Sequence, residues 1–294
     1  MRNASLNRAR PGLAGRLAGV VLAAGLAAGG IAFATPAAAD QHGPAPTKAG
    51  VERNGPYQVD TYQATNVRGF KDATIYAPRS TTERFGIVSI VPGFVSVWSQ
   101  MAWMGPRLAS HGFVVVGVNT NSLVDGPTER SQQQWAALQN ALADGRVNGR
   151  IDRGRLAVAG WSMGGGGTLE SARAHPEVRA AIPMAPWDLV NKNFSGVRAP
   201  TLIMGADGDI VAPNPEHSIP FYQTVGASEK ALAIVNGDDH FLPTHETPTQ
   251  SRMYISWLKR FVDDDTRYTQ FLCPGPSVGT VLSELDEYRQ TCPM

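Results

Sequence analysis

Six short, continuous apolar segments constrain the fold of this chain more than any other feature of its sequence. Each is bounded by Gly, Pro or Asp, and they occupy residues 85–93, 112–120, 155–162, 179–187, 199–207 and 230–238. Between and after them lie stretches whose composition suits helices, at residues 103–111, 130–143, 166–175, 217–225 and 250–264. Strands that are buried on both faces and alternate with helices predict a mostly parallel sheet with helices on either side. The expected fold class is therefore α/β, in one domain.

Two earlier segments have a different pattern. Residues 57–64 and 71–78 alternate apolar and polar side chains, as half-buried strands do, so we expect them to form an antiparallel edge of the sheet. Residues 40–56 are rich in Pro and Gly and lack an apolar period, which predicts a flexible leader. The folded domain is expected at residues 57–294.

The first 39 residues have the composition of an export signal. Four arginines and no acidic residue accompany an apolar stretch, and the sequence TPAAAD that follows has the small-x-small pattern of a signal-peptidase site. We predict a signal peptide at residues 1–39, with cleavage after Ala39. A membrane anchor is the alternative, but the apolar stretch is shorter than the roughly 20 residues that a span needs. The mature protein is expected to be secreted and extracellular, with no membrane segment.

Charge and cysteine content narrow the possible partners further. Removal of residues 1–39 takes away four of the 26 basic residues and none of the 25 acidic ones, which leaves 22 against 25, or a net charge of about −3. Nucleic acid is therefore not an expected partner.

Cys273 and Cys292 are the only two cysteines, and in an oxidising compartment we expect them to form one disulfide rather than two free thiols.

The third apolar run ends in a glycine-rich turn. Its sequence GWSMG, at residues 160–164, matches the pattern Gly-x-Ser-x-Gly and lies after a predicted strand and before a predicted helix. A serine on such a sharp turn has a strained backbone, and side chains beside it would collide with the strand and the helix, so glycine is needed there. An incidental serine in a glycine-rich turn is the alternative. The strand–turn–helix context favours Ser162 as a nucleophile.

An acid and a histidine follow two later apolar runs. A serine hydroxyl needs a base to take its proton and a carboxylate to orient that base. In an open α/β sheet such groups gather at the carboxyl ends of the strands, and the chain order serine, acid, histidine is satisfied by Asp209 and His240. Asp207 is a rival acid and His245 is a rival base.

Two backbone N–H groups are candidates to stabilise an oxyanion. One belongs to Met163, directly after the serine, and the other to Phe94, in the loop after the first apolar run. The rings of Phe94 and Trp187 are expected at the mouth of the site, with ordinary packing as the alternative. Only residues 188–200 separate Trp187 from the next strand, which leaves no room for a lid or cap. The site should therefore lie open on the surface.

These segments together resemble the bacterial cutinase-like polyester hydrolases, which include the polyethylene terephthalate (PET) hydrolases. The resemblance runs from about Gly55 to the C-terminus and is carried by residues 92–94, 103–122, 160–167, 185–187, 200–213, 217–221, 255–273 and 287–294. It implies a single-domain α/β-hydrolase fold without a lid, a catalytic domain at residues 57–294, and hydrolysis of carboxylic esters in cutin- or PET-type polyesters.

The resemblance also implies a role for each matching residue. These roles are nucleophile (Ser162), acid (Asp209), base (His240), oxyanion donors (Phe94 and Met163), substrate contacts (Phe94, Trp161 and Trp187) and terminal disulfide (Cys273 and Cys292). His217 and Phe221 match a bulky pair that packs behind the equivalent of Trp187 in the cutinase branch, so His217 joins the predicted substrate-binding set. The family usually has a threonine and a small residue after the position of Phe94. Here residues 95–98 are expected to make that edge of the substrate subsite more apolar.

The family's calcium site would be formed here by Asp207, Asn236 and Asp286. Because an asparagine replaces a usual aspartate, one charge is lost and the calcium affinity should fall. No cofactor is expected to be required, and calcium would act only as a stabilising ion.

The leading hypothesis is a secreted, monomeric serine carboxylesterase whose substrates are polyesters or small esters. A general short-chain carboxylesterase or lipase without polymer activity is the alternative within the same chemistry. A non-catalytic binding protein on the same scaffold is disfavoured, because the candidate triad and both glycines beside Ser162 are present.

Overall fold

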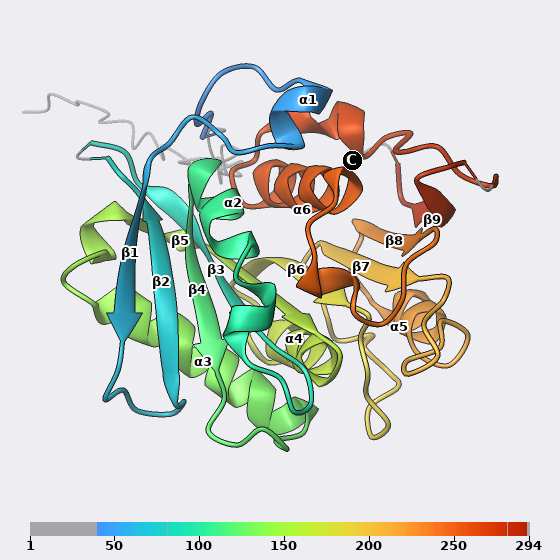
Figure 1. Cartoon of the computed structure of the whole chain (residues 1–294), viewed down its shortest axis with the longest axis horizontal. Coiled ribbons are helices and arrows are strands. Elements are labelled where there is room, and N and C mark those ends of the chain that lie inside the picture. Colours follow the sequence, from blue (N-terminus) through green and yellow to red (C-terminus); the bar gives the residue numbers. More distant parts are fainter. Residues whose placement is uncertain (1–39, 81, 281, 293–294) are drawn as a thin grey trace, which may run out of the picture. The chain divides into compact units, whose positions relative to one another are not determined.

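A mixed sheet of nine strands forms the centre of this computed structural model, which describes residues 40–80, 82–280 and 282–292 (Figure 1). The strands are β1 Val59–Ala64, β2 Asp72–Pro78, β3 Phe85–Val91, β4 Phe113–Asn119, β5 Ile151–Trp161, β6 Val178–Met184, β7 Thr201–Ala206, β8 Lys230–Val235 and β9 Leu285–Gln290. Their order in the sheet is β1-β2-β4-β3-β5-β6-β7-β8-β9. Neighbours from β4 to β8 are parallel, and β1, β2 and β9 are antiparallel edge strands. The predicted α/β fold is confirmed, and the predicted signal peptide lies outside the described residues.

Helices cover both faces of this sheet. They are α1 Lys48–Val51, α2 Met104–Ser110, α3 Pro127–Ala143, α4 Met163–Ala174, α5 Ser218–Thr224 and α6 Pro248–Phe261, with short 3-10 helices η1 Trp98–Met101, η2 Asn148–Arg150, η3 Leu242–Thr244 and η4 Thr266–Phe271. Side chains of α3, α4 and α5 form a core on one face with Ile87 and Val91 of β3, while α2 and α6 form a second core on the other face with Val88 and Ile90. Because both faces of β3 are covered, its sequence is apolar except for Ser89, whose buried hydroxyl donates to the Gln134 carbonyl at 3.0 Å.

The strand β9 was not predicted from the sequence. It pairs antiparallel with β8, from Gln290 opposite Ala231 to Leu285 opposite Val235. Only Leu285 of this strand is buried, so the strand has no apolar alternation. The backbone hydrogen bonds to β8 stabilise it, and sequence periodicity does not report such pairing.

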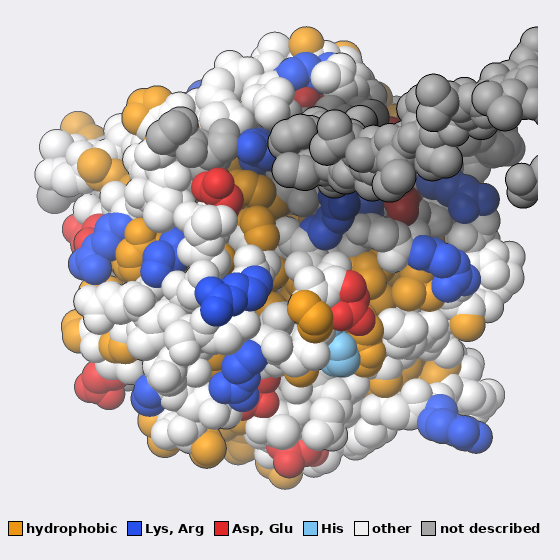
Figure 2. Space-filling view, turned by 180° about the vertical axis from the view of Figure 1, so that it is seen from behind, with side chains coloured by type: hydrophobic (Ala, Val, Ile, Leu, Met, Phe, Trp, Pro, Cys, Tyr) orange, Lys and Arg blue, Asp and Glu red, His pale blue; other side chains and the backbone are white. Residues whose placement is uncertain are grey.

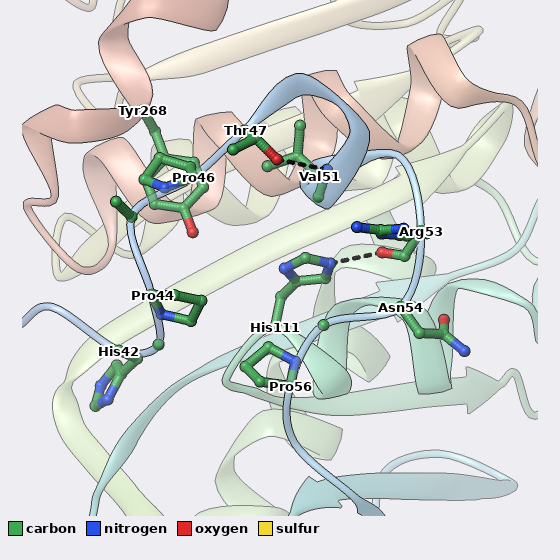
Figure 3. Close-up of a pocket in the computed structure, with 14 residues that line it drawn as sticks. His42, Pro44, Pro46, Thr47, Val51, Arg53, Asn54, Pro56, His111 and Tyr268 are labelled. Carbon is green, nitrogen blue, oxygen red and sulfur yellow. Dashed lines mark hydrogen bonds between the residues drawn. The ribbon is translucent and has the colours of Figure 1, made fainter.

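Residues 40–56, expected to be a flexible leader, instead follow a defined path over the domain. The hydroxyl of Thr47 caps α1 by accepting a hydrogen bond from the Gly50 N–H at 3.0 Å. Val51 and His42 are 1% and 5% exposed, and Figure 3 shows the segment around a cavity of about 390 Å³. A helix cap and a few buried side chains hold this segment, and neither produces the periodic pattern on which the prediction relied.

The predicted disulfide is present between Cys273 and Cys292, whose Cα atoms lie 5.9 Å apart. It joins the segment after η4 to the residues just beyond β9. The hydroxyl of Tyr288 donates to the Leu272 carbonyl at 2.9 Å, so a second contact links the same two segments.

Replacement of both cysteines by serine is expected to lower the melting temperature by several degrees. The bond closes a loop with a sequence separation of 19 residues, which restricts the unfolded chain by roughly 3 kcal/mol in the entropy model. A change of 1 kcal/mol corresponds to about 2–4 °C in a domain of this size. Calorimetry checks the shift, and ester hydrolysis at room temperature should be retained because neither cysteine belongs to the candidate site. An unchanged melting temperature would contradict the prediction.

The face of the molecule in Figure 2 carries side chains of both charges. On the face shown in Figure 2, the described Lys and Arg side chains are scattered among acidic and apolar ones and form no continuous basic band. Among the residues that the structure describes, no helix combines the length and the apolar character that a membrane crossing requires.

Candidate active site

Ser162 lies at the junction of β5 and α4, on a strained backbone. Its φ is 58° and its ψ is −122°, a combination that residues with a Cβ rarely adopt. A Cβ on Gly160 would lie 2.3 Å from the Gly164 carbonyl oxygen, and a Cβ on Gly164 would lie 2.4 Å from the carbonyl oxygen of Val91 in β3. Both glycines of the motif are therefore required on steric grounds.

Hydrogen bonds hold this turn against the next strand. The Ser162 N–H donates to the carbonyl of Met184, at the end of β6, at 2.9 Å. The Ser162 carbonyl accepts from the N–H of Gly165 at 2.8 Å and from that of Trp187 at 2.9 Å. The same contacts that fix the serine therefore also fix the backbone of Trp187.

The three candidate catalytic side chains meet at the carboxyl ends of β5, β7 and β8. His240 Nε2 lies 2.9 Å from Ser162 Oγ, and His240 Nδ1 lies 2.9 Å from Asp209 Oδ2. The exposed fractions of Ser162, Asp209 and His240 are 6%, 6% and 5%. Asp209 Oδ1 accepts from the backbone N–H groups of Val211 and Ala212 at 2.9 and 2.7 Å, so both carboxylate oxygens are engaged.

The rival acid and the rival base lie elsewhere. Asp207 Oδ1 accepts from the N–H groups of Gly237 and Asp238 at 2.9 and 3.3 Å, which is a turn-stabilising contact. His245 is half exposed, and its Nε2 lies 3.2 Å from Asp238 Oδ2. The geometry therefore favours the pair that the chain order selected.

The two candidate oxyanion donors flank the serine. Met163 is the first residue of α4, so its N–H has no acceptor within the helix. Phe94 follows Gly93, and a Cβ on Gly93 would lie only 2.7 Å from Ser162 Cβ. The loop that carries Phe94 thus passes directly against Ser162, and Phe94 is 50% exposed.

Arg130 of α3 supports this loop and was missed by sequence analysis. Its guanidinium is fully buried and donates to the carbonyls of Pro92 at 2.9 Å, Leu123 at 2.8 Å and Asp125 at 2.8 Å. Burial lowers the pKa of Arg130 to about 10, and the charge of Asp125 opposes this shift, so the side chain remains a cation at neutral pH. The sequence carries no signal for this role, because the three carbonyls belong to loops that only the fold brings together.

A wall of aromatic rings stands behind Trp187. The rings of Trp187 and His217 stack with centroids 6.1 Å apart, and Phe221 packs edge-on against His217 at 5.7 Å. His217 is 2% exposed, so it supports Trp187 from behind rather than lining the open site. Burial, followed by the charge of Lys192, lowers the pKa of His217 to about 4. The imidazole is therefore neutral at neutral pH, and its Nδ1 lies 3.4 Å from Lys192 Nζ.

Trp161, expected as a substrate contact, is placed differently. It is 2% exposed, and its indole N–H donates to the His240 carbonyl at 2.7 Å, so it positions the histidine from beneath. Sequence analysis missed Phe241, which is 51% exposed. The Phe241 ring lies 5.9 Å from that of His240 and 5.6 Å from that of Trp161. Its position in the sequence, directly after His240, could have identified Phe241 as a residue of the site.

The apolar edge of the substrate subsite that was expected at residues 95–98 is only partly formed. Val95 is 56% exposed, but Ser96 and Trp98 are 5% and 3% exposed. Trp98 packs flat over β4, where a Cβ on Gly117 would lie 1.9 Å from its ring. The sequence does not reveal this outcome, because the space for the indole comes from a glycine on a neighbouring strand.

The residues of the predicted calcium site fit a calcium ion poorly. Asp207 already accepts from the backbone N–H groups of the two residues that follow Asn236. Asn236 donates its amide protons to the carbonyls of Thr280 and Ser283, both at 3.1 Å, and Asp286 is exposed on β9. Within the described ranges, no group of three or more His, Cys, Asp or Glu side chains is arranged to hold a metal.

Comparison with known proteins adds relatives of known activity. The family described as PETase, PET hydrolase-like, matches residues 34–293. Cutinase est1 of Thermobifida alba is 48% identical over 259 residues, which cover 86% of this chain and 86% of that protein. The bis(hydroxyethyl) terephthalate hydrolase of Streptomyces coelicolor is 46% identical over 304 aligned positions, which cover 99% and 97% of the two chains. Cutinase 2 of Thermobifida cellulosilytica is 48% identical over 259 residues, or 86% of this chain and 98% of that one.

Proposed function

The chain belongs to the PET hydrolase-like family, and from this membership we propose that it is a secreted serine hydrolase that cleaves the ester bonds of cutin- or PET-type polyesters. That it is a carboxylic-ester hydrolase follows from the family and from its cutinase and terephthalate-ester relatives. The proposal adds the residues that perform the reaction and the physical form of the substrate.

In the proposed reaction His240 acts first as a base. Its Nε2, 2.9 Å from Ser162 Oγ, takes the hydroxyl proton as the oxygen attacks the ester carbonyl. Asp209 accepts a hydrogen bond from the Nδ1–H group of His240 and stabilises the imidazolium that forms. The charge that develops on the carbonyl oxygen is stabilised by the N–H groups of Met163 and Phe94.

The tetrahedral intermediate then collapses to an acyl-enzyme, which water hydrolyses in a second step. The bond from the carbonyl carbon to the alcohol oxygen breaks, and the His240 proton passes to the departing alcohol. Water, deprotonated by the same imidazole, releases the acid from Ser162 and regenerates the hydroxyl. All of the groups that these steps use are side chains or backbone of the chain itself, so we propose that no cofactor is required.

The observation that favours a polymer over a small ester is the distribution of exposed apolar side chains. Of the eleven large hydrophobic residues exposed among the described residues, nine lie on loops that follow the carboxyl ends of β3, β4, β6, β7 and β8. They are Phe94, Val95, Leu123, Val124, Leu189, Val190, Ile210, Val211 and Phe241. We call these nine residues the apolar rim. Exposed apolar side chains gathered at one edge of a soluble protein are typical of a contact surface, and a small soluble ester has no use for one this wide.

Polar substitution on the apolar rim is expected to lower polymer hydrolysis selectively. In Val190→Ser/Ile210→Asn, two side chains that are 87% and 90% exposed lose their apolar surface. Burial of such a side chain contributes up to about 1.5–3 kcal/mol, so partial contact with a film predicts a loss of roughly threefold to tenfold in product release. Turnover of p-nitrophenyl butyrate should stay unchanged, because neither side chain takes part in the hydrogen bonds that join Ser162, His240 and Asp209.

A matched control is available on the same protein. Leu282 is 93% exposed but lies outside the apolar rim, so Leu282→Asn should change neither activity. Release of soluble acids from amorphous PET and aliphatic polyester films is measured beside hydrolysis of p-nitrophenyl butyrate. A wild type that cleaves the soluble ester but releases nothing from either film would support the alternative, a general short-chain carboxylesterase or lipase.

The remaining parts of the proposal concern location and partners. We propose that the mature enzyme is extracellular and monomeric, with a polyester or small ester as its partner and neither nucleic acid nor membrane. Any bound calcium would act on stability rather than on the reaction, because the proposed reaction uses none of the three candidate ligands.

A further inference from the structure

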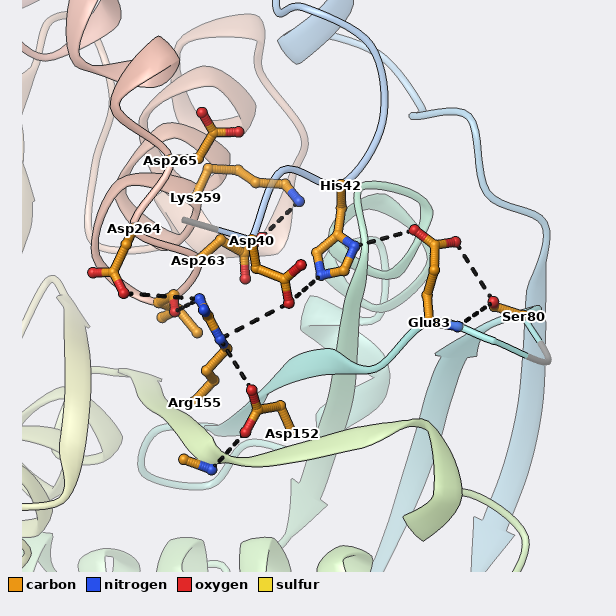
Figure 4. Close-up of polar contacts among 12 residues, drawn as sticks. Asp40, His42, Ser80, Glu83, Asp152, Arg155, Lys259, Asp263, Asp264 and Asp265 are labelled. Atoms are coloured by element: carbon orange, nitrogen blue, oxygen red, sulfur yellow. Dashed lines mark hydrogen bonds and ion pairs between the residues drawn. The ribbon is translucent and has the colours of Figure 1, made fainter. Parts of the chain in front are cut away.

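A cluster of charged side chains surrounds the first described residue, and ester hydrolysis uses none of it. The N–H of Asp40 donates to the backbone carbonyl of Asp263 at 2.8 Å, just beyond the end of α6. Figure 4 shows the side chains around this contact. The charged members of the cluster are Asp40, His42, Glu83, Asp152, Arg155, Arg179, Lys259, Asp263 and Asp264.

Within this cluster, Asp263 is fully buried and only half paired. Its Oδ2 accepts from Lys259 Nζ at 2.8 Å, and both side chains are 0% exposed. Its Oδ1 has no hydrogen-bond partner among the described residues. A buried carboxylate oxygen without a donor destabilises the folded state, and burial raises the pKa of the Asp263 carboxyl although Lys259 opposes this shift. The described residues thus supply no donor for Asp263 Oδ1.

Among the described residues of the cluster, negative charge also exceeds positive charge. Its permanent cations are Arg155, Arg179 and Lys259, and they stand among five carboxylates, so three minus five leaves an excess of two negative charges. His42 lies between two of the carboxylates, 3.1 Å from Asp40 and 3.2 Å from Glu83. Even a protonated His42 would leave one negative charge in excess. A buried or half-buried cluster of this kind gains stability from one further cation.

We propose that removal of the export signal supplies both the missing donor and the missing charge. Hydrolysis of the bond between Ala39 and Asp40 consumes one water, leaves a carboxylate on Ala39, and converts the Asp40 amide nitrogen into an ammonium group. The amide has one proton, which the Asp263 carbonyl already accepts, whereas the ammonium group has three protons and a positive charge. One of the two new protons is donated to Asp263 Oδ1. Asp263 is thus an internal binding site for the mature N-terminus, and processing strengthens the folded state.

The expected consequence is a stability difference between the mature chain and a chain that keeps residues ahead of Asp40. An extension of two residues, Ala38 and Ala39, moves the ammonium group away and restores an amide at Asp40. We expect the extended chain to melt roughly 3–12 °C lower than the mature chain at pH 7, which is the shift that one hydrogen bond to a charged group produces in a domain of this size.

The pH dependence of this difference has a definite sign. The ordinary pKa of an α-amino group is about 7.7–8.0, and a carboxylate partner raises it in the folded state. The stabilisation is therefore complete below about pH 8 and is lost as the pH rises through the raised folded-state value. The other titratable groups of the cluster, with Tyr57 on Glu83, are present in both chains, so their effects cancel in the difference.

The test compares melting temperatures of four pairs of chains, each pair beginning at Asp40 or at Ala38. The pairs are wild type at pH 7, wild type at about pH 10, Asp263→Asn at pH 7 and Asp152→Asn at pH 7. Asp152 is a matched control, because it pairs with Arg155 at 3.1 Å and accepts from the Gly154 N–H at 2.8 Å. The difference should be present in wild type and Asp152→Asn at pH 7. It should be clearly smaller in Asp263→Asn, which removes one carboxylate and leaves the other four, and at pH 10.

Mass spectrometry of protein secreted by an exporting host should give Asp40 as the first residue. A different first residue, equal melting of the wild-type pair at pH 7, or a difference that survives undiminished in Asp263→Asn would each overturn the proposal. If Asp263→Asn does not fold, the pH comparison of the wild-type pair decides alone. Hydrolysis of p-nitrophenyl butyrate should be the same throughout, which confirms that each folded chain has an intact site.

Discussion

Replacement of Ser162 by alanine is expected to lower ester hydrolysis by about five to six powers of ten. His240 lies 2.9 Å from Ser162 Oγ and Asp209 lies 2.9 Å from His240, so the three groups act as a unit that cannot form an acyl-enzyme without the hydroxyl. Alanine keeps the Cβ that the turn accommodates, and the fold should be retained. Initial rates on p-nitrophenyl butyrate, with far-ultraviolet circular dichroism of the same sample, measure both effects.

A second serine, Ser171 on the helix α4 that follows Ser162, provides the control. Ser171 is 1% exposed on α4, and its hydroxyl has no hydrogen-bond partner among the described residues. Ser171→Ala should therefore leave activity within about twofold of wild type. If folded Ser162→Ala protein keeps more than a few per cent of the wild-type activity, Ser162 is not the nucleophile.

The central sheet could be predicted from the sequence because its strands are buried on both faces. Because helices cover both of their faces, strands such as β3 and β4 are apolar at nearly every position, which gives the runs their length and their sharp Gly, Pro and Asp boundaries. The edge strand β9 and the segment at residues 40–56 do not meet that condition. They are held by backbone pairing, a helix cap and polar contacts to distant residues, and these leave no periodic trace in the sequence.

The candidate triad could be predicted for a different reason. A steric motif identified Ser162, and chain order then restricted the acid and the base to two choices each. Residues that act through the backbone of other segments could not be found this way. Arg130 donates hydrogen bonds to three loop carbonyls, and the indole N–H of Trp161 donates to the backbone carbonyl of His240. Their roles depend on which loops the fold brings together, so composition and spacing say nothing about them.

Replacement of Asp209 by asparagine is expected to lower kcat by roughly four powers of ten, whereas the same change at Asp207 should have almost no effect. The two carboxylates are two positions apart, and each accepts hydrogen bonds from two backbone N–H groups. Only Asp209 has its second oxygen on a histidine, 2.9 Å from His240 Nδ1. The pair of variants therefore compares one chemical change with and without contact to the base.

The size of the effect at Asp209 follows from how its two oxygens are used. Oδ1 accepts from Val211 and Ala212 at 2.9 and 2.7 Å, so an asparagine keeps its carbonyl oxygen there and turns its NH₂ group toward His240 Nδ1. An NH₂ donor in that place stabilises the tautomer whose proton is on Nε2, and that nitrogen can no longer accept the proton of Ser162. At Asp207 the amide oxygen can keep both backbone bonds and no tautomer changes, so turnover should stay within about twofold of wild type. Loss of turnover in Asp207→Asn together with normal turnover in Asp209→Asn would reverse the assignment of the acid.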